Sequence, residues 1–123
     1  MKYLILIYSN PKSREVWDGF SRDQRAAGLR EYEALHESMV ASGELIVSEA
    51  LADPSLAKRV TAHEGQTIVT DGPYAEAKEH LAGFFLLDCA SMDRALEQAA
   101  RIPEAALGLV EVRPIMALDG WDI

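Results

Sequence analysis

The sequence is poor in the features that mark several large classes of protein. It has one cysteine in 123 residues, Cys89, so no disulfide can form within the chain and nothing indicates an oxidising compartment. No hydrophobic run approaches the ~18 residues that a membrane-spanning helix needs. No signal-peptide pattern opens the chain either. These absences predict a cytoplasmic protein that does not bind a membrane.

Positive charge is also scarce. The chain has 12 Lys and Arg against 20 Asp and Glu, which gives a formal net charge of −8. Nucleic acids and anionic membrane surfaces both attract clustered positive charge, so we expect neither as a partner. Acidity also keeps proteins soluble, and the charge by itself therefore identifies no partner.

The motifs that hold metals and common cofactors are missing. The histidines, His36, His63 and His80, lack close metal-ligand spacing. No phosphate-binding loop, dinucleotide glycine fingerprint or nucleophile elbow occurs. We therefore expect no metal and no cofactor. Cys89 follows an apolar run, a position typical of a buried thiol rather than a nucleophile.

The composition is that of one soluble globular domain, with 49% hydrophobic and 26% charged residues. We see no repeats and no linker, so we expect a single domain over residues 1–123. Its core covers about residues 1–116, and residues 117–123 form a tail. Trp121 in that tail is expected to contact a partner subunit, because aromatic residues suit interfaces.

The local patterns predict four strands, two helices and a hairpin. Asn10-Pro11 favours a loop up to Asp18, and Tyr74–His80 fits a short helix or an ordered loop. Ser21 and Gln24 form a capping-box pattern that begins the first helix. The expected strands are 3–8, 44–51, 82–88 and 109–115, the helices 22–42 and 92–101, and the hairpin strands 58–62 and 66–70.

This order places a helix between strands in each half of the chain. Two such halves make the split β-α-β pattern of a ferredoxin-like α+β fold, with helices on one face of an antiparallel sheet. The first strand is apolar on both faces, because Ile5 and Ile7 alternate with Leu4 and Leu6. We expect a homodimer in which a second copy covers the open sheet face. The hairpin or the tail is the alternative cover.

The segment Asp71–Glu79 reads Asp-Gly-Pro-Tyr-Ala-Glu-Ala-Lys-Glu. It resembles the signature of the DGPF-domain proteins, a branch of the YCII-related family, which usually read Asp-Gly-Pro-Phe-Ala-Glu-Thr-Lys-Glu. Tyr74 and Ala77 are the two departures. The opening Met1–Tyr8 and the segments Ala100–Pro103 and Val110–Pro114 are similar as well.

The resemblance implies a dimeric α/β barrel built from ferredoxin-like subunits. Some relatives are encoded beside, or fused to, extracytoplasmic-function sigma factors, which implies such a factor as a partner. More distant members carry a histidine in the first helix, proposed as an acid/base group with an aspartate. Tyr32 stands at that position here and His36 lies one turn later, so this chain departs from the catalytic pattern.

Two groups of residues are candidates for the site. The acid/base candidates are Tyr32, His36 and Asp71, and the ligand-binding candidates are Tyr74, Glu76, Lys78, Glu79, Arg101, Glu111 and Arg113. Each has a structural alternative. Asp71–Pro73 can be a turn in which Asp71 accepts a hydrogen bond from the Tyr74 N–H. His36 can be a histidine at the edge of the core, and the two arginines with Glu111 can be a salt-bridged surface.

Two functions remain open from the sequence. The first is a small dimeric protein that binds a small polar molecule, with acid/base chemistry of the lyase type. The second is a non-enzymatic interaction module, an accessory to a sigma factor. The direction in which Asp71–Glu79 faces separates them: a cavity favours the ligand, and an outward position favours a docking surface.

Overall fold

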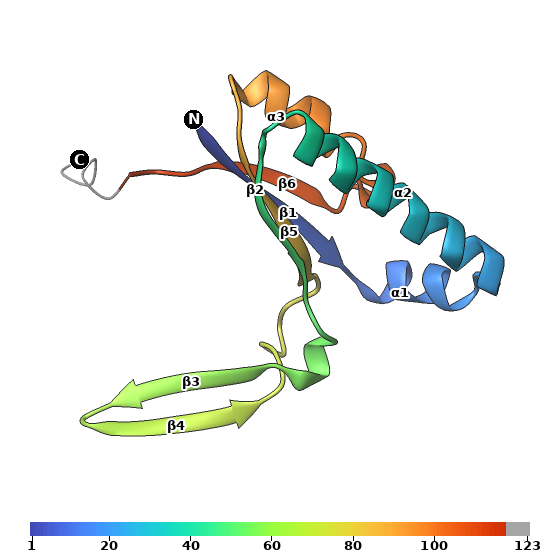
Figure 1. Cartoon of the computed structure of the whole chain (residues 1–123). Coiled ribbons are helices and arrows are strands. Elements are labelled where there is room, and N and C mark those ends of the chain that lie inside the picture. Colours follow the sequence, from blue (N-terminus) through green and yellow to red (C-terminus); the bar gives the residue numbers. More distant parts are fainter. Residues whose placement is uncertain (118–123) are drawn as a thin grey trace.

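The computed structural model describes residues 1–117 and is built on one four-stranded antiparallel sheet (Figure 1). Its strands are β1 (Lys2–Ser9), β2 (Leu45–Ala50), β5 (His80–Asp88) and β6 (Val110–Pro114), in the spatial order β2-β5-β1-β6. β1 and β5 are therefore central, and β2 and β6 are the edges. This order is the one that the split β-α-β pattern predicts.

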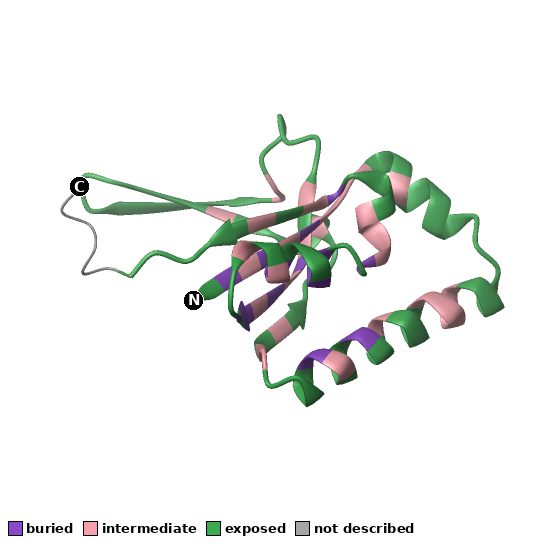
Figure 2. Ribbon diagram, turned by 90° about the horizontal axis from the view of Figure 1, so that it is seen from above, coloured by how far each residue is buried: buried purple, intermediate pink, exposed green. Residues whose placement is uncertain are grey.

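Two helices lie on the same face of this sheet, α2 (Arg22–Ala41) and α3 (Met92–Ala99) (Figures 1 and 2). α2 connects β1 to β2, and α3 connects β5 to β6. The α+β class with an antiparallel sheet is thus confirmed. The sheet of the single chain is open and does not close into a barrel.

The alternation along β1 divides the sheet into two apolar faces. Ile5 and Ile7 are buried under the helices, together with Phe85 and Leu87 of β5. The intervening Leu4 and Leu6 point to the opposite face and are only half-buried. The predicted two-sided hydrophobicity of β1 is therefore confirmed, and nothing within residues 1–117 buries its second face fully.

A β-bulge in β2 makes one sequence prediction wrong. Alternation predicts that Leu45 and Val47 share a face, with Ile46 on the other. The ladder instead pairs Leu45 with Leu87 and Val47 with Leu86, with a register shift between them. The extra residue, Ile46, rotates the strand, so Leu45 packs on the core and Val47 lies on the open face.

Capping explains both the helix that was predicted and the one that was not. At the start of α2 the Ser21 hydroxyl accepts from the Gln24 N–H, and the Gln24 side chain accepts from the Ser21 N–H. The segment expected as a loop forms helix α1 (Pro11–Asp18). Its Asn10 and Ser13 make the same reciprocal cap. Pro11 sits at the first helical position, where its missing N–H costs nothing.

The hairpin forms as predicted and stands apart from the sheet. Strands β3 (Lys58–His63) and β4 (Gln66–Asp71) pair around Glu64 and Gly65, which both have positive φ. Figures 1 and 2 show the hairpin projecting to the side away from α1. Every hairpin residue except Arg59 is exposed.

Two further sequence predictions concern membrane-spanning helices and the C-terminal tail. No helix within residues 1–117 is long and apolar enough to cross a membrane. The proposed contact of Trp121 with a partner lies outside the described residues.

Candidate functional site

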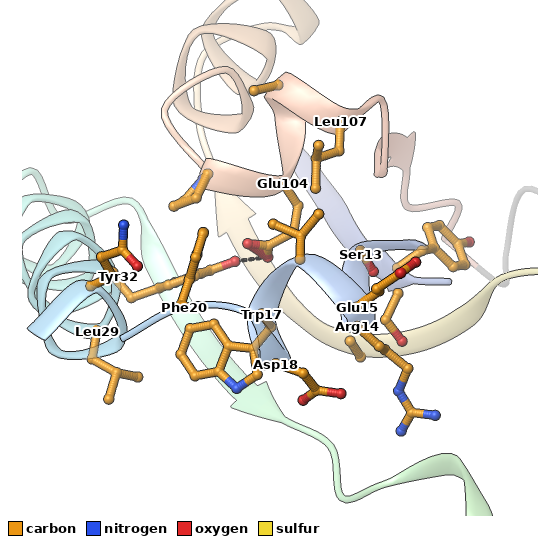
Figure 3. Close-up of a pocket in the computed structure, with 18 of the residues that line it drawn as sticks. Ser13, Arg14, Glu15, Trp17, Asp18, Phe20, Leu29, Tyr32, Glu104 and Leu107 are labelled. Carbon is orange, nitrogen blue, oxygen red and sulfur yellow. Dashed lines mark hydrogen bonds between the residues drawn. The ribbon is translucent and has the colours of Figure 1, made fainter. Parts of the chain in front are cut away.

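A pocket of about 1220 Å³ lies between α1, the first half of α2 and the short 3-10 helix η2 (Pro103–Leu107) (Figure 3). We call it the α1 pocket. Its inner wall comes from the ends of β1 and β5, where Tyr8 and His80 line it. His80, which adjoins turn residues in the sequence, is half-buried here.

A phenol and a carboxyl group meet in this pocket. The Tyr32 hydroxyl of α2 donates a hydrogen bond to the Glu104 carboxylate of η2 (Figure 3). Burial raises the pKa of Glu104 above its usual range, against a smaller opposing effect of its own backbone N–H. A carboxyl group whose pKa is shifted by burial, beside a phenol, has the features of a proton-transfer site.

Pro103 and Glu104 have a local reason to occupy these positions. Pro103 occupies the first turn of η2, and Glu104 is the acid in that turn. Both preferences follow from the free N–H groups at a helix start. The turn therefore places a carboxyl group where it meets the Tyr32 hydroxyl of α2.

The outer wall of the pocket is aromatic and comes from the end of α1. The rings of Trp17 and Phe20 meet edge to face with centroids 6.1 Å apart. The Arg25 guanidinium lies 5.4 Å from the centre of the Trp17 ring and also donates to the Trp17 and Asp18 carbonyls. Arg25 thus holds the C-terminal end of α1 in place, as a cation at a helix C-terminus does.

Two of the three predicted acid/base residues lie away from this pocket. Tyr32 lines it, as described. His36 is exposed on α2 and is not among the lining residues. Asp71 is exposed at the end of β4, where its carboxylate pairs with Lys58 Nζ at 2.5 Å. The structure therefore does not bring Tyr32, His36 and Asp71 together.

The segment from Asp71 to Glu79 is a turn-rich loop. Gly72 has φ +81°, a conformation that only glycine adopts readily, and its N–H donates to the Ala57 carbonyl at 2.7 Å. Tyr74 is exposed under the Arg59 guanidinium, which lies 5.0 Å from the ring centre. Glu76 and Lys78 are exposed as well. None of these residues lines the α1 pocket.

Glu79 and Glu111 do come together, at a second, smaller cavity of about 390 Å³ that Tyr8 also lines. The Tyr8 hydroxyl donates to Glu111 Oε1 at 2.9 Å. Burial raises the pKa of Tyr8, and the hydrogen bond and charge of Glu111 add to that shift. Arg113 is exposed on the same strand face as Glu111.

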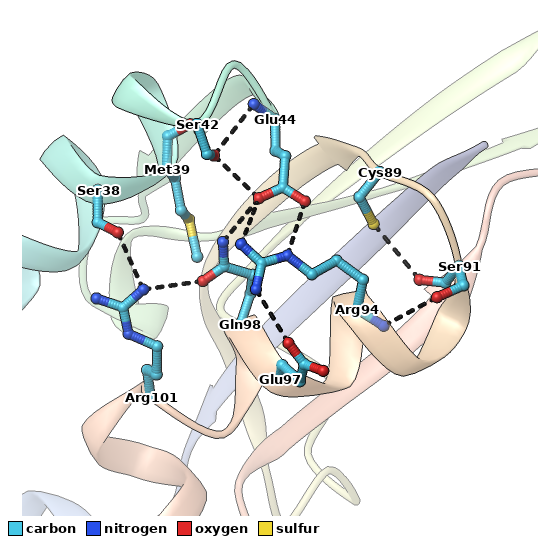
Figure 4. A network of polar contacts seen from close by, with 10 residues as sticks. All are labelled: Ser38, Met39, Ser42, Glu44, Cys89, Ser91, Arg94, Glu97, Gln98 and Arg101. Carbon is cyan, nitrogen blue, oxygen red and sulfur yellow. Dashed lines mark hydrogen bonds and ion pairs between the residues drawn. The ribbon is translucent and has the colours of Figure 1, made fainter.

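Arg101 belongs to a different region, a polar network that joins α3 to the end of α2 (Figure 4). Its guanidinium donates to Ser38 Oγ and Gln98 Oε1, each at 3.0 Å. At the centre of the network Arg94 donates to both oxygens of Glu44, at 2.9 and 3.0 Å. Arg101 is thus separated from Glu111 and Arg113, which lie on the opposite face of the sheet.

The residues that sequence reasoning missed are Glu104, Trp17 and Phe20. Glu104 follows Pro103 immediately, and an acid one residue after a proline was the available signal for a short helix start. Trp17 and Phe20 fell in the segment expected as a loop. Within residues 1–117 no three His, Cys, Asp or Glu side chains are arranged to hold a metal ion.

Comparison with known proteins gives a family match. The family model of the YCII-related domain matches residues 1–119. An uncharacterized protein of Rhizobium meliloti (strain 1021) is 36% identical over 117 residues, which is 94% of this chain and 92% of that protein. A solved structure of 5-chloro-2-hydroxyhydroquinone dehydrochlorinase (TftG) from Burkholderia phenoliruptrix AC1100, in complex with 2,5-dihydroxybenzoquinone, is 19% identical. The likeness covers 97% of each chain with a TM-score of 0.48.

Proposed function

The chain belongs to the YCII-related family, and we propose that it binds a small organic molecule in the α1 pocket and moves a proton on it. The observation that carries this proposal is the Tyr32–Glu104 pair, which lies in the wall of the α1 pocket. Glu104 is the acid/base group. Tyr32 holds its carboxylate in position and supplies a hydrogen-bond donor beside it.

The chemistry follows from the raised pKa of Glu104. A carboxyl group with a pKa closer to neutral pH is a better proton acceptor than an exposed glutamate. In the ionised form it takes a proton from an acidic C–H or O–H group of the ligand. In an isomerisation it returns that proton to a neighbouring atom. In an elimination the electrons of the broken C–H bond form a double bond, while a leaving group on the adjacent carbon departs with its bonding pair and takes up the proton. The reaction class is isomerisation or elimination, which proton transfer alone can start.

A screen for thermal stabilisation with small organic molecules tests the binding step. Hits are then incubated in deuterated water, and NMR follows deuterium uptake into the ligand. We expect Glu104→Gln to abolish this uptake and Tyr32→Phe to slow it about 10–100-fold. Glu97→Gln, on the solvent side of α3, is the control and leaves it unchanged. Absence of any stabilising ligand, or uptake that survives Glu104→Gln, would overturn the proposal.

We also propose that the protein is a cytoplasmic homodimer of the DGPF branch, joined through the open sheet faces. Leu4, Leu6, Phe84, Leu86 and Val47 form the centre of this face. In the single chain the first four of these side chains are only half-buried, and Val47 is 38% exposed. A contiguous apolar face of this kind marks an interface, because burying it in a partner removes it from water. Two such sheets facing one another would give the dimeric α/β barrel.

Light scattering tests the dimer directly. We expect a mass near twice the 13.5 kDa of one chain. Leu6→Glu puts a carboxylate at the centre of the face and converts the dimer to monomer, whereas Ile46→Glu, at the edge of the sheet, leaves it intact. A stable monomer of the wild-type chain contradicts the proposal.

The exposed hairpin and the Asp71–Glu79 loop favour a second candidate function, an interaction module. Val60 and Val69 of the projecting hairpin are 67% and 56% exposed, and Tyr74 of the adjoining loop, which lies against Arg59 of β3, is 66% exposed. A two-stranded hairpin is marginally stable alone, so a partner would stabilise it. The candidate partner is an extracytoplasmic-function sigma factor, recovered by pull-down from the native host. Recovery of the homodimer alone counts against this candidate.

A further inference from the structure

The α1 pocket combines an aromatic wall with an excess of carboxyl groups. The acidic side chains that line it are Glu15, Asp18, Glu31, Asp53 and Glu104. Its one guanidinium, Arg14, pairs with Asp53. Within residues 1–117 no ion pair involves the other four carboxyl groups. The pocket therefore presents net negative charge to a ligand.

From this charge and from the aromatic wall we infer that the ligand of the α1 pocket is a cationic amine with an aromatic or other flat apolar body. The inference rests on the proposed function and adds the chemical class of the molecule that is bound. An anionic ligand, such as a carboxylate or a phosphate, would meet several carboxylates and no unpaired guanidinium. A protonated amine is attracted by each of these carboxylates.

Glu104 is half-buried, whereas the other four carboxyl groups that line the pocket are exposed. Its burial makes it costly to ionise in the empty pocket, and a bound ammonium group offsets that cost. Tyr32 already donates its hydroxyl hydrogen to this carboxylate, so the remaining lone pairs of Glu104 are available to N–H donors of the ligand. An ammonium group offers three such donors.

The aromatic wall suits the rest of such a ligand. Trp17 and Phe20 are 41% and 39% exposed, so their rings have surface available for contact from the pocket. One face of Trp17 already accepts a cation, the guanidinium of Arg25. Apolar side chains of α1 and η2, Val16 and Leu107, extend this wall. When a flat apolar ligand packs against this wall, apolar surface of both the ligand and the pocket is removed from water.

Three probes that share a benzene ring and a short chain, and differ in the charge at its end, separate the classes. Phenethylamine is cationic, phenethyl alcohol is neutral and hydrocinnamate is anionic at neutral pH. Binding is followed by NMR titration of the full-length protein at low salt. We expect the amine to bind at least about tenfold more tightly than hydrocinnamate, with the alcohol between them.

Variants assign the preference to the pocket. Glu104→Gln keeps an acceptor for Tyr32 and removes the charge, so we expect it to weaken amine binding about tenfold and alcohol binding less than about twofold. Glu33→Gln is the matched control, since Glu33 is exposed on α2 and outside the pocket lining. It leaves the affinity for all three probes unchanged.

The outcomes test the charge of the preferred ligand separately from whether the α1 pocket binds small molecules at all. Equal or tighter binding of hydrocinnamate, with shifts at pocket residues, overturns the inference and leaves the α1 pocket as a small-molecule site. An amine preference that Glu104→Gln does not reduce also overturns the inference. If none of the three probes shifts the signals of pocket residues, both this inference and the proposed small-molecule site in the α1 pocket are overturned.

Discussion

The hydroxyl of Tyr32 on α2 donates a hydrogen bond to the carboxylate of Glu104 on η2, 72 positions along the chain. This bond connects the first half of the molecule to the second at the wall of the α1 pocket. It also keeps a carboxyl group in a place where burial opposes its ionisation. Removing the charge of Glu104 and removing the Tyr32 donor therefore have different consequences.

Glu104→Gln should make the folded protein more stable at neutral pH. Because the pKa of Glu104 is raised on folding, the ionised group favours the unfolded chain, and wild-type stability falls as pH rises from 4.5 through the folded pKa. The glutamine variant lacks this decline and still accepts from Tyr32. Urea unfolding of both proteins across this range measures the difference. Equal pH dependence in the two proteins contradicts the assignment.

Glu44→Gln should have the opposite pH signature. The hydrogen bonds from Arg94, with smaller contributions from Gln98 and Ser42, lower the pKa of Glu44 from 4.5 to about 2. Its ionised form therefore stabilises the fold above pH 4.5, and this contribution is lost as pH falls toward 2. We expect a loss of about 1–3 kcal/mol at neutral pH, shrinking to nothing in acid.

The matched control for Glu44 is Glu97, which binds the same arginine. Its side chain is 68% exposed, compared with 14% for Glu44. Exposed ion pairs contribute little, so Glu97→Gln should cost below about 0.5 kcal/mol at any pH. A cost equal to that of Glu44→Gln would show that the network stabilises the fold by general charge rather than by the half-buried bidentate contact between Arg94 and Glu44.

Gly83→Ala should destabilise the sheet. A Cβ at Gly83 would lie 2.9 Å from the Glu49 carbonyl oxygen, a backbone atom that cannot move independently of β2. We expect a cost of about 1–3 kcal/mol in the free energy of unfolding. Gly28→Ala is the contrasting variant, because its nearest atom is a Trp17 ring carbon at 3.8 Å. In the helix interior it should stabilise by about 0.5–1 kcal/mol.

Asn10→Ala should release α1 without unfolding the domain. No residue of α1 is buried, so the helix depends on its cap and on the contacts of Arg25. Loss of an N-cap costs about 0.5–2 kcal/mol. Hydrogen exchange should show faster exchange only at the backbone amides of α1 that follow Pro11. Ser91→Ala removes the equivalent cap of the packed helix α3 and should lower global stability instead.

The elements that the sequence predicted best are those in which local pattern and tertiary packing agree. The capping box at Ser21, the positive φ of Gly43 after α2 and the hairpin turn at Gly65 are all local preferences that the fold leaves unopposed. Helical spacing places Leu29, Leu35 and Met39 on one apolar face of α2. Leu35 and Met39 are buried as this spacing predicts, whereas Leu29 is 62% exposed and lines the α1 pocket.

The failures have definite physical origins. Asn10-Pro11 is a common loop signal, but asparagine is also a strong N-cap and proline is favoured at the first helical position, and here the two residues begin α1. The bulge at Ile46 depends on the pairing of β2 with β5, which no pattern within residues 44–51 contains. The pairing of Tyr32 with Glu104 depends on the docking of η2 against α2, a tertiary contact that sequence spacing does not encode.

The bulge at Ile46 has a further consequence, because β2 is an edge of the sheet. An edge strand presents a row of unpaired N–H and C=O groups. A strand of another chain can pair with that row, and repeated pairing of this kind leads to aggregation. The extra residue kinks and twists the strand, so an incoming straight strand would lose register partway along it. The bulge therefore disfavours the repeated addition of strands at this edge, which would lead to fibres, even though both faces of the neighbouring strands are apolar.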